Sequence, residues 1–137
     1  MCANDWSESV YLDLDVILAE LKESDWLASE VDLDSIADPK TSVATGIELQ
    51  YVIEDEWERD RVVRAHQEIV DCGISVVPLD SDALDAAGTL RSQYDSLNVF
   101  DGVHLGTAHT LGEPIVSTDT LFPQIPEVEH VDPRALD

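Results

Sequence analysis

The chain has 137 residues, 44% of them hydrophobic and 27% charged, which is enough apolar material for one folded domain and excludes a disordered chain. Its 30 Asp and Glu residues oppose 7 Lys and Arg residues, so the formal net charge at pH 7 is −23. This charge repels nucleic acid in dilute buffer, but concentrated salt screens the repulsion, and the composition resembles that of cytoplasmic proteins from halophiles.

The beginning of the chain has the pattern of a strand, an acidic residue and a helix. Residues 10–12 predict a buried strand that ends at Asp13, and the apolar residues within 16–21 predict an amphipathic helix. Ser24 is expected to cap a second short helix, and residues 31–39 to form an acidic loop that ends at Pro39.

The middle of the chain predicts a strand, helices and a further strand. Residues 41–44 can form a short strand, and a helix is expected to open at Thr45. Residues 54–71 are helical in composition, with Gly73 as their stop. Residues 74–79 are rich in β-branched side chains and predict a short buried strand.

The last part of the chain continues this alternation. Ser81 is expected to cap one helix, and Asn98 to cap another that runs over 99–111 before Gly112. Two more strands are predicted, at residues 114–117 and, as an edge strand, within residues 128–131.

Strands that alternate with helices predict a parallel sheet with helices on both faces. We therefore expect an α/β fold with three layers, α/β/α, around a central parallel sheet of four to five strands. No repeat, low-complexity tract or linker divides the sequence, so residues 1–137 are expected to form a single domain.

The sequence also indicates the compartment. Two cysteines, Cys2 and Cys72, are too few for a disulfide framework or a zinc-ligand set. The amino terminus has neither the basic region nor the apolar run of a signal peptide, and no segment reaches the ~20 apolar residues of a membrane span. A cytoplasmic protein without a membrane partner is expected.

Acidic residues stand at the predicted carboxyl ends of strands, where ligands bind in open parallel sheets. Four carboxylates that converge there repel one another unless a divalent cation compensates them. Oxygen ligands without His or Cys favour Mg²⁺ or Mn²⁺ over zinc. The acids at these positions are Asp13 and Asp119 at strand ends, and Glu48 and Asp101 one turn into the neighbouring helices.

Four segments resemble, in order and approximate spacing, the sequence motifs of PIN domains. They are residues 10–18, 42–49, 101–108 and 115–122, and the resemblance spans about residues 9–122. It implies that the metal ligands are Asp13, Glu48, Asp101 and Asp119, and that Ser117 orients Asp119 or a metal-bound water.

Two positions depart from the PIN pattern. Asp15 stands where the family usually has a neutral polar residue, and Leu121 stands where many members keep a further acid. These departures leave the number of metal ions open.

The resemblance also implies an activity and partners. The family hydrolyses RNA phosphodiesters with a metal-activated water, which leaves a 5′-phosphate, and often acts as the toxin of a VapC-type toxin–antitoxin pair. It implies an RNA substrate, Mg²⁺ or Mn²⁺, a cognate antitoxin protein and a homodimer.

Each candidate ligand also has a purely structural interpretation. Thr45 and Glu48 have the spacing of a capping box, as do Asn98 and Asp101. Asp119 has the position of a residue that caps the turn toward Phe122, and Asp15 that of a helix cap.

Other conspicuous side chains have simple explanations. Arg59, Arg61 and Arg64 could contact phosphates, but the acids around them favour a salt-bridged surface. His104 and His109 on the helix of Asp101 are interpreted as packing or surface residues.

Two rival functions remain. Residues 13–16 also match the nucleophile motif of haloacid-dehalogenase-type phosphatases, with Asp13 as the nucleophile, but no lysine follows Lys40 to stabilise an aspartyl-phosphate. The other rival is a non-catalytic interaction module whose acids only solvate the surface in concentrated salt.

Overall fold

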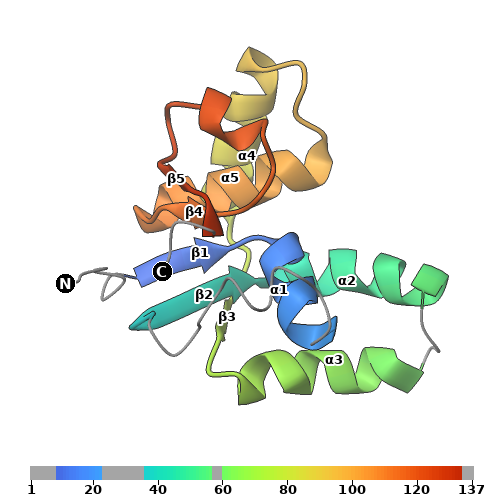
Figure 1. Cartoon of the computed structure of the whole chain (residues 1–137). Coiled ribbons are helices and arrows are strands. Elements are labelled where there is room, and N and C mark those ends of the chain that lie inside the picture. Colours follow the sequence, from blue (N-terminus) through green and yellow to red (C-terminus); the bar gives the residue numbers. More distant parts are fainter. Residues whose placement is uncertain (1–8, 23–35, 57–59, 134–137) are drawn as a thin grey trace.

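The computed structural model of the chain describes residues 9–22, 36–56 and 60–133 (Figure 1). The predicted short helix after Ser24 lies outside these residues. The elements in chain order are β1 (Ser9–Leu12), α1 (Leu14–Lys22), β2 (Asp38–Ser42), α2 (Val43–Glu56), α3 (Asp60–Asp71), β3 (Ser75–Val77), α4 (Ser81–Gln93), α5 (Val99–Leu111), β4 (Ile115–Val116), the 3-10 turn η3 (Phe122–Gln124) and β5 (His130–Val131).

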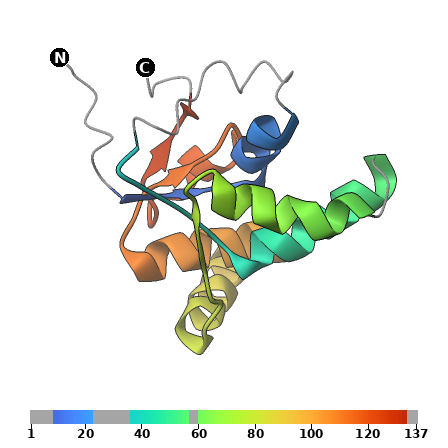
Figure 2. The ribbon, with the colours of Figure 1, turned by 90° about the horizontal axis from the view of Figure 1, so that it is seen from below.

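Five parallel strands form one sheet in the order β3-β2-β1-β4-β5. Strand β1 is the centre, and the chain crosses from one of its sides to the other between β3 and β4. Helices cover both faces, with α1 and α3 on one side and α4 and α5 on the other (Figures 1 and 2). The structure confirms the predicted three-layer α/β fold and its parallel sheet.

Alternating side chains of β1 enter two separate cores, as the two-residue period of a strand requires. Val10 and Leu12 pack among apolar residues of α1, α2 and α3, including Ile17 and Ile69. Tyr11 faces the opposite side and packs among residues of α4, α5 and the carboxyl-terminal segment. The strand that precedes Asp13 is therefore buried on both faces, which fixes the position of Asp13.

Strand β2 begins before the start of its predicted range of 41–44 and also ends before the end of that range. Its first residues belong to the segment that was expected to be a loop ending at Pro39. Proline has no N–H to donate within a sheet. Here β3 begins opposite Lys40, so Pro39 precedes the stretch of β2 that is paired on both sides.

Strand β3 is an edge strand, so the prediction of a buried strand at 74–79 was wrong. Ser75 is exposed, and Val76 and Val77 are half-buried. β-branched composition indicates a strand without telling an edge from a centre. Strand β5, predicted as an edge strand, lies at the other edge.

Two of the predicted helix starts were wrong. Helix α2 begins at Val43, two residues before Thr45, directly after β2. Helix α4 is capped by Asp80, whose side chain accepts a hydrogen bond from the N–H of Ala83, so Ser81 is its first residue. The predicted helical stretch 54–71 contains the end of α2 and all of α3, and residues 57–59 between them lie outside the described part.

The predicted end of α3 and both ends of α5 are confirmed. Gly73 and Gly112 follow these helices with φ of 83° and 68°, the left-handed conformation that glycine adopts without strain. Asn98 forms a full capping box with Asp101 at the start of α5. No helix in the described part of the chain is long and apolar enough to cross a bilayer.

Helices α4 and α5 form an antiparallel hairpin with very close contact. A β-carbon at Gly106 would lie 2.6 Å from the backbone nitrogen of Ala87 and 2.7 Å from the carbonyl oxygen of Ala83. This contact requires glycine in α5 and fixes the helix that carries Asp101.

Candidate metal centre

A pocket of about 370 Å³ lies at the carboxyl end of β1. All four predicted ligands line it. Among the described residues, the lining consists of Asp13, Leu14, Asp15, Leu18, Glu48, Asp101, His104, Thr118 and Asp119. Five of these nine residues are carboxylates and none is Lys or Arg, so the lining residues contribute a strong excess of negative charge.

Asp13 is held rigidly between β1 and α1. Its N–H donates to the carbonyl of Val116 at 3.0 Å, which extends the pairing of β1 with β4. Its Oδ1 accepts from the N–H of Leu14 and its Oδ2 accepts from the hydroxyl of Ser117, both at 2.8 Å. Both carboxylate oxygens are therefore oriented by donors from neighbouring strands and helices.

The charge of Asp13 is poorly solvated. Its side chain is only 13% exposed. Burial raises the pKa of Asp13 from 3.8 to about 6, with the charge of His104 opposing the rise and that of Asp15 adding to it. A cation that binds beside this buried carboxylate lowers the free energy of its charged form.

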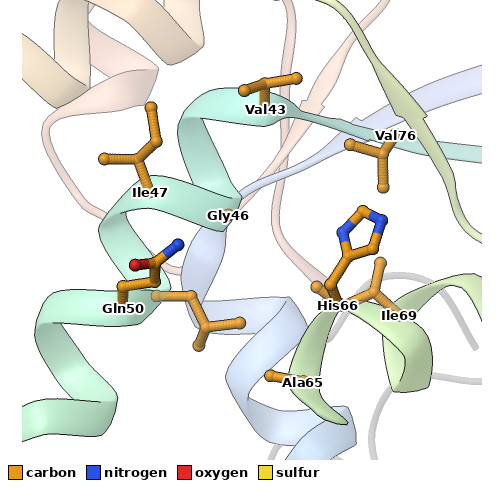
Figure 3. A pocket seen from close by; sticks show the side chains of 9 residues that line it. Val43, Gly46, Ile47, Gln50, Ala65, His66, Ile69 and Val76 are labelled. Carbon is orange, nitrogen blue, oxygen red and sulfur yellow. The ribbon is translucent and has the colours of Figure 1, made fainter. Parts of the chain in front are cut away.

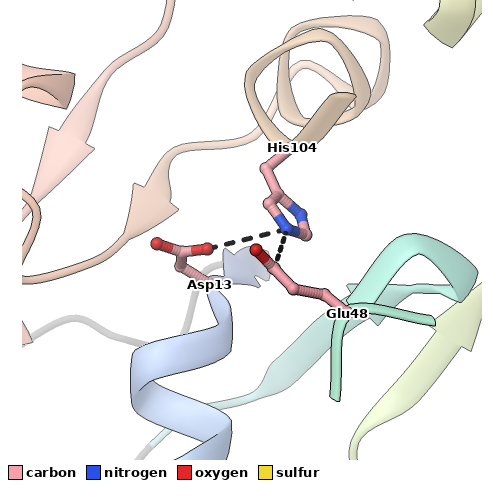
Figure 4. Close-up of side chains that lie close together, drawn as sticks. All are labelled: Asp13, Glu48 and His104. Carbon is pink, nitrogen blue, oxygen red and sulfur yellow. Dashed lines mark hydrogen bonds and ion pairs between the residues drawn. The ribbon is translucent and has the colours of Figure 1, made fainter. Parts of the chain in front are cut away.

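Glu48 lies on α2 and points toward Asp13 and His104 (Figure 4). One of its oxygens, Oε1, is 2.9 Å from Nε2 of His104, and that nitrogen is 3.9 Å from Oδ1 of Asp13. These three residues offer ligand atoms that all lie within 4.8 Å of one another, the one such group of three or more His, Cys, Asp or Glu residues in the described part of the chain.

The capping interpretation of Glu48 was wrong. Helix α2 begins before Thr45, whose hydroxyl hydrogen-bonds with that of Thr41 at 2.7 Å, and both hydroxyls are buried. Glu48 is thus available to the pocket, as the PIN resemblance implied.

His104 is the site residue that the sequence analysis missed. It is 2% exposed and lies at the centre of the group. Burial by itself would lower the pKa of His104, but the hydrogen bond to Glu48 and the charge of Asp13 raise it overall. Its position three residues after Asp101 on one helix was the available signal, because residues with that spacing share a helix face.

Asp101 forms the capping box of α5 and also lines the pocket. Its Oδ2 accepts from the N–H of Asn98 at 3.2 Å, and its own N–H donates to Oδ1 of Asn98 at 2.8 Å. It also lines the pocket, and burial raises its pKa, with the charge of Asp119 contributing. The cap orients the carboxylate without removing it from the pocket.

Asp119 and Ser117 follow β4. Oδ1 of Asp119 accepts from the N–H of Leu121 at 2.9 Å, so the predicted turn cap forms as well. The buried hydroxyl of Ser117 accepts from the N–H of Asp119 at 3.0 Å and donates to Asp13. Ser117 therefore joins the carboxylate of Asp13 to the backbone of Asp119.

Asp15 lies in the first turn of α1 and also reaches across the sheet. Its Oδ1 accepts from the N–H of Val16 at 2.9 Å. Its Oδ2 accepts from the N–H of Thr118 at 2.7 Å and from the hydroxyl of Thr118. These contacts hold the loop after β4 over the end of β1.

The donor set of the pocket fits a hard divalent cation. Carboxylate oxygens are the ligands that Mg²⁺ and Mn²⁺ prefer, and the five acids have no Lys or Arg as counterion among the residues that line the pocket. Burial, the main cause of the raised pKa of Asp13, makes the charged form of this carboxyl group costly until a cation lies beside it.

Two of the basic residues, Lys40 and Arg61, are paired with acids away from the pocket. Lys40 pairs with Glu113 and, at 3.2 Å, with Asp38, and it does not line the pocket. Arg61 pairs with Glu68 at 3.1 Å and also donates to the carbonyl of Leu21, as expected of a salt-bridged surface. Arg59 lies outside the described residues.

A second pocket, of about 230 Å³, lies between α2 and α3 (Figure 3). Its lining is mainly apolar and includes Val43, Ile47 and Ile69, with His66 and Gln50 as polar members. None of the predicted ligands is among its lining residues, so it is separate from the acidic pocket.

Comparison with known proteins places this geometry in context. The sequence model described as "PIN domain" matches residues 10–128. No curated protein is significantly similar in sequence to the chain. The matched segment includes all four acids and Ser117.

Solved structures share the fold at low identity. A chain of a DNA-bound VapBC complex from Salmonella typhimurium superposes with a TM-score of 0.77 at 19% identity, covering 91% of this chain and 98% of that one. A VapBC2 complex from Rickettsia felis, bound to a promoter DNA fragment, gives 0.72 at 14%, covering 90% and 98%. VapBC-5 from Mycobacterium tuberculosis, a member of a family of toxin–antitoxin systems, gives 0.66 at 20%, covering 90% and 97%.

Proposed function

The chain belongs to the PIN-domain family, and on this basis we propose that it is a metal-dependent endoribonuclease that acts as the toxin of a toxin–antitoxin pair. The observation that carries the proposal is the convergence of five carboxylates in one pocket without a Lys or Arg among its lining residues. We propose Asp13, Glu48, Asp101 and Asp119 as the residues that hold Mg²⁺ or Mn²⁺.

In this proposal the divalent ion supplies an activated water and neutralises charge on the scissile phosphate. Asp13 and Glu48 provide two carboxylates with oxygens within 4.8 Å of each other, and the hydroxyl of Ser117 orients Asp13. Asp101 and Asp119 add negative charge to the lining of the same pocket. No side-chain nucleophile would be required: in-line attack of water on phosphorus, with the 3′-oxygen as the leaving group, would leave a 5′-phosphate and a 3′-hydroxyl.

The phosphatase alternative is not supported. Its chemistry requires a lysine beside the aspartyl nucleophile, whereas Lys40 is engaged by Glu113 and Asp38 outside the pocket. Asp15, the second acid of the phosphatase motif, is occupied by Thr118. The family match agrees with the nuclease.

The test is cleavage of a defined RNA pool in concentrated KCl with Mn²⁺ or Mg²⁺, followed by mapping of the new ends. We expect cleavage that chelator stops and metal restores, with 5′-phosphate ends. Asp13→Asn and Asp119→Asn should abolish it, whereas Asp85→Asn, which changes an exposed acid on α4, should not. Products with 2′,3′-cyclic phosphate, or metal-independent cleavage, would contradict the proposal.

We propose that the protein works in the cytoplasm of a halophile. The net charge of −23 supports this, because such a surface needs concentrated salt to fold and to approach RNA. Cleavage rate should rise with KCl concentration into the molar range; a maximum in dilute buffer would contradict it.

We also propose an antitoxin partner and a homodimer. Apolar side chains spaced four apart on α2 support a protein interface: Val43, Ile47 and Tyr51 are 43%, 47% and 63% exposed. Light scattering should give the mass of a dimer for the pure chain and of a monomer for Ile47→Glu, while Val63→Glu on α3 serves as the control. For the antitoxin, mass spectrometry should identify a second small chain in the protein purified from its own cells; a purely homomeric sample would contradict this part.

A further inference from the structure

The imidazole of His104 lies between two hydrogen-bond partners in the interior. Its Nδ1 is 2.6 Å from the hydroxyl of Tyr11, and its Nε2 is 2.9 Å from Oε1 of Glu48. Its ring also packs against the rings of Tyr11 and Phe100, with centroids 5.8 and 6.4 Å away. Partners on both edges and rings beside it hold the imidazole in one orientation.

The protons in this network can be assigned by counting donors. Oγ of Ser42 accepts from the N–H of Ala44 at 3.2 Å and lies 2.7 Å from the hydroxyl of Tyr11. Its own proton is therefore free to be donated to Tyr11, and Tyr11 in turn can donate to Nδ1 of His104. A neutral imidazole then carries its proton on Nε2, where it donates to the Glu48 carboxylate.

The opposite assignment leaves a conflict. If Nδ1 carried the proton and donated to Tyr11, the lone pair of Nε2 would face a carboxylate oxygen at 2.9 Å, and both would be acceptors. Both His104 and Tyr11 are buried, so water cannot readily relieve that repulsion. The first assignment gives a hydrogen-bond partner to every polar group in the network that runs from Ser42 through Tyr11 and His104 to Glu48.

Resting on the proposed nuclease function, we propose that His104 is a positioning residue rather than a metal ligand. It holds Glu48 toward Asp13 by donating from Nε2, and Tyr11 and Ser42 fix the tautomer that makes this possible. Distance alone would allow His104 to act as the third ligand with Asp13 and Glu48. The tautomer removes the Nε2 lone pair and leaves an all-oxygen donor set, which selects Mg²⁺ or Mn²⁺ and disfavours zinc.

The first experiment is long-range ¹⁵N–¹H correlation NMR of the His104 ring in the wild-type protein, without metal and with saturating Mg²⁺. We expect a proton on Nε2 in both states. An Nε2 without a proton in the Mg²⁺-loaded protein would overturn the proposal. This measurement needs no variant and no RNA, so it stands or falls separately from the nuclease activity.

The second experiment compares Mn²⁺ affinity, measured by calorimetry, in two variants. Gln places an N–H near the position of Nε2, so His104→Gln should keep affinity close to wild type, while His104→Leu should lose about 10-fold or more. Equal losses in two folded variants would overturn the proposal, because they would identify His104 as a ligand; so would full affinity in His104→Leu.

Tyr11→Phe tests the tautomer lock, because it removes one hydroxyl and keeps the buried ring. Because Nδ1 loses its donor, we expect the preference for the Nε2-protonated form to weaken and the affinity for Zn²⁺ to rise relative to Mn²⁺. Tyr94→Phe is the matched control, since its hydroxyl bonds Glu127 at the surface. An unchanged tautomer and metal preference in Tyr11→Phe would overturn the role of Tyr11. Failure of RNA cleavage with a normal Nε2 proton would refute the nuclease and leave this inference standing.

Discussion

Replacing Asp13 with Asn removes a negative charge from a carboxylate that is 13% exposed and keeps the shape of the side chain. Without metal, this charge is a cost to the folded protein, because water solvates it in the unfolded chain and mostly does not in the pocket. We expect the metal-free Asn variant to be more stable than the wild type near neutral pH.

The magnitude follows from the pKa. A pKa raised from 3.8 to about 6 corresponds to about 3 kcal/mol of unfolding free energy at pH values above both. The amide has one oxygen for the two donors, Leu14 N–H and the Ser117 hydroxyl, and loss of one hydrogen bond costs about 1 kcal/mol. The net gain expected for Asp13→Asn is about 2 kcal/mol.

The pH dependence has a definite sign. A carboxyl group whose pKa is raised by folding favours the folded state below its unfolded pKa and loses this contribution as pH rises through the folded value. The wild type should therefore lose stability relative to the Asn variant between about pH 4 and about pH 6. Below about pH 4 the gain from the amide should disappear.

Saturating Mn²⁺ should reverse the order of stability at neutral pH. At 100 times its Kd, a ligand adds about 2.7 kcal/mol to the folded state that binds it, and Asp13→Asn should gain almost none of this. Urea denaturation in concentrated KCl measures the unfolding free energy of the wild type and of Asp13→Asn, each with chelator and with Mn²⁺. An Asn variant that is less stable than wild type in chelator at neutral pH, or that Mn²⁺ stabilises fully, would refute the reasoning.

Three further predictions concern other parts of the structure. Gly106→Ala should lower the unfolding free energy by about 1–3 kcal/mol in denaturant titration, because its β-carbon meets backbone, whereas Gly88→Ala, with open space around it, should raise it slightly. Ser117→Ala should weaken Mn²⁺ binding by about 10-fold or more in calorimetry, because it releases a ligand that the hydroxyl orients; unchanged affinity would contradict this. Lys40→Met should lower the unfolding free energy by about 3 kcal/mol, because Glu113 is left buried without a counterion. Adding Glu113→Gln should recover most of this loss. Equal stability of the single and double variants would argue against the pairing.

The fold was largely predictable from the sequence because its signals are local. The apolar run before Asp13 and the Asn98 cap of α5 each specify an element without reference to the rest of the chain. Their alternation was enough to predict a parallel sheet covered on both faces. What failed were properties set by neighbours, such as the edge position of β3 and the helix start before Thr45.

The acidic residues of the candidate site could be predicted from the sequence, but the hydrogen bonds between them and their neighbours could not. The order of motifs brought Asp13, Glu48, Asp101 and Asp119 to one pocket, as expected. The network through His104 depends on contacts between α5, β1 and α2, which are far apart in the sequence. The spacing of His104 from Asp101 indicated a shared helix face, but the hydrogen bond from His104 to Glu48 is visible only in the tertiary structure.

The uneven distribution of charge in the fold has a thermodynamic consequence. Lys40 and Glu113 neutralise each other away from the pocket, while the five acids at the carboxyl end of β1 have no Lys or Arg among their pocket neighbours. In the proposed function, a polyanionic substrate that enters there meets like charge until a cation binds, so we expect positive heterotropic cooperativity between the two ligands. By linkage, we then expect RNA to strengthen binding of the ion by the same factor by which the ion strengthens binding of RNA.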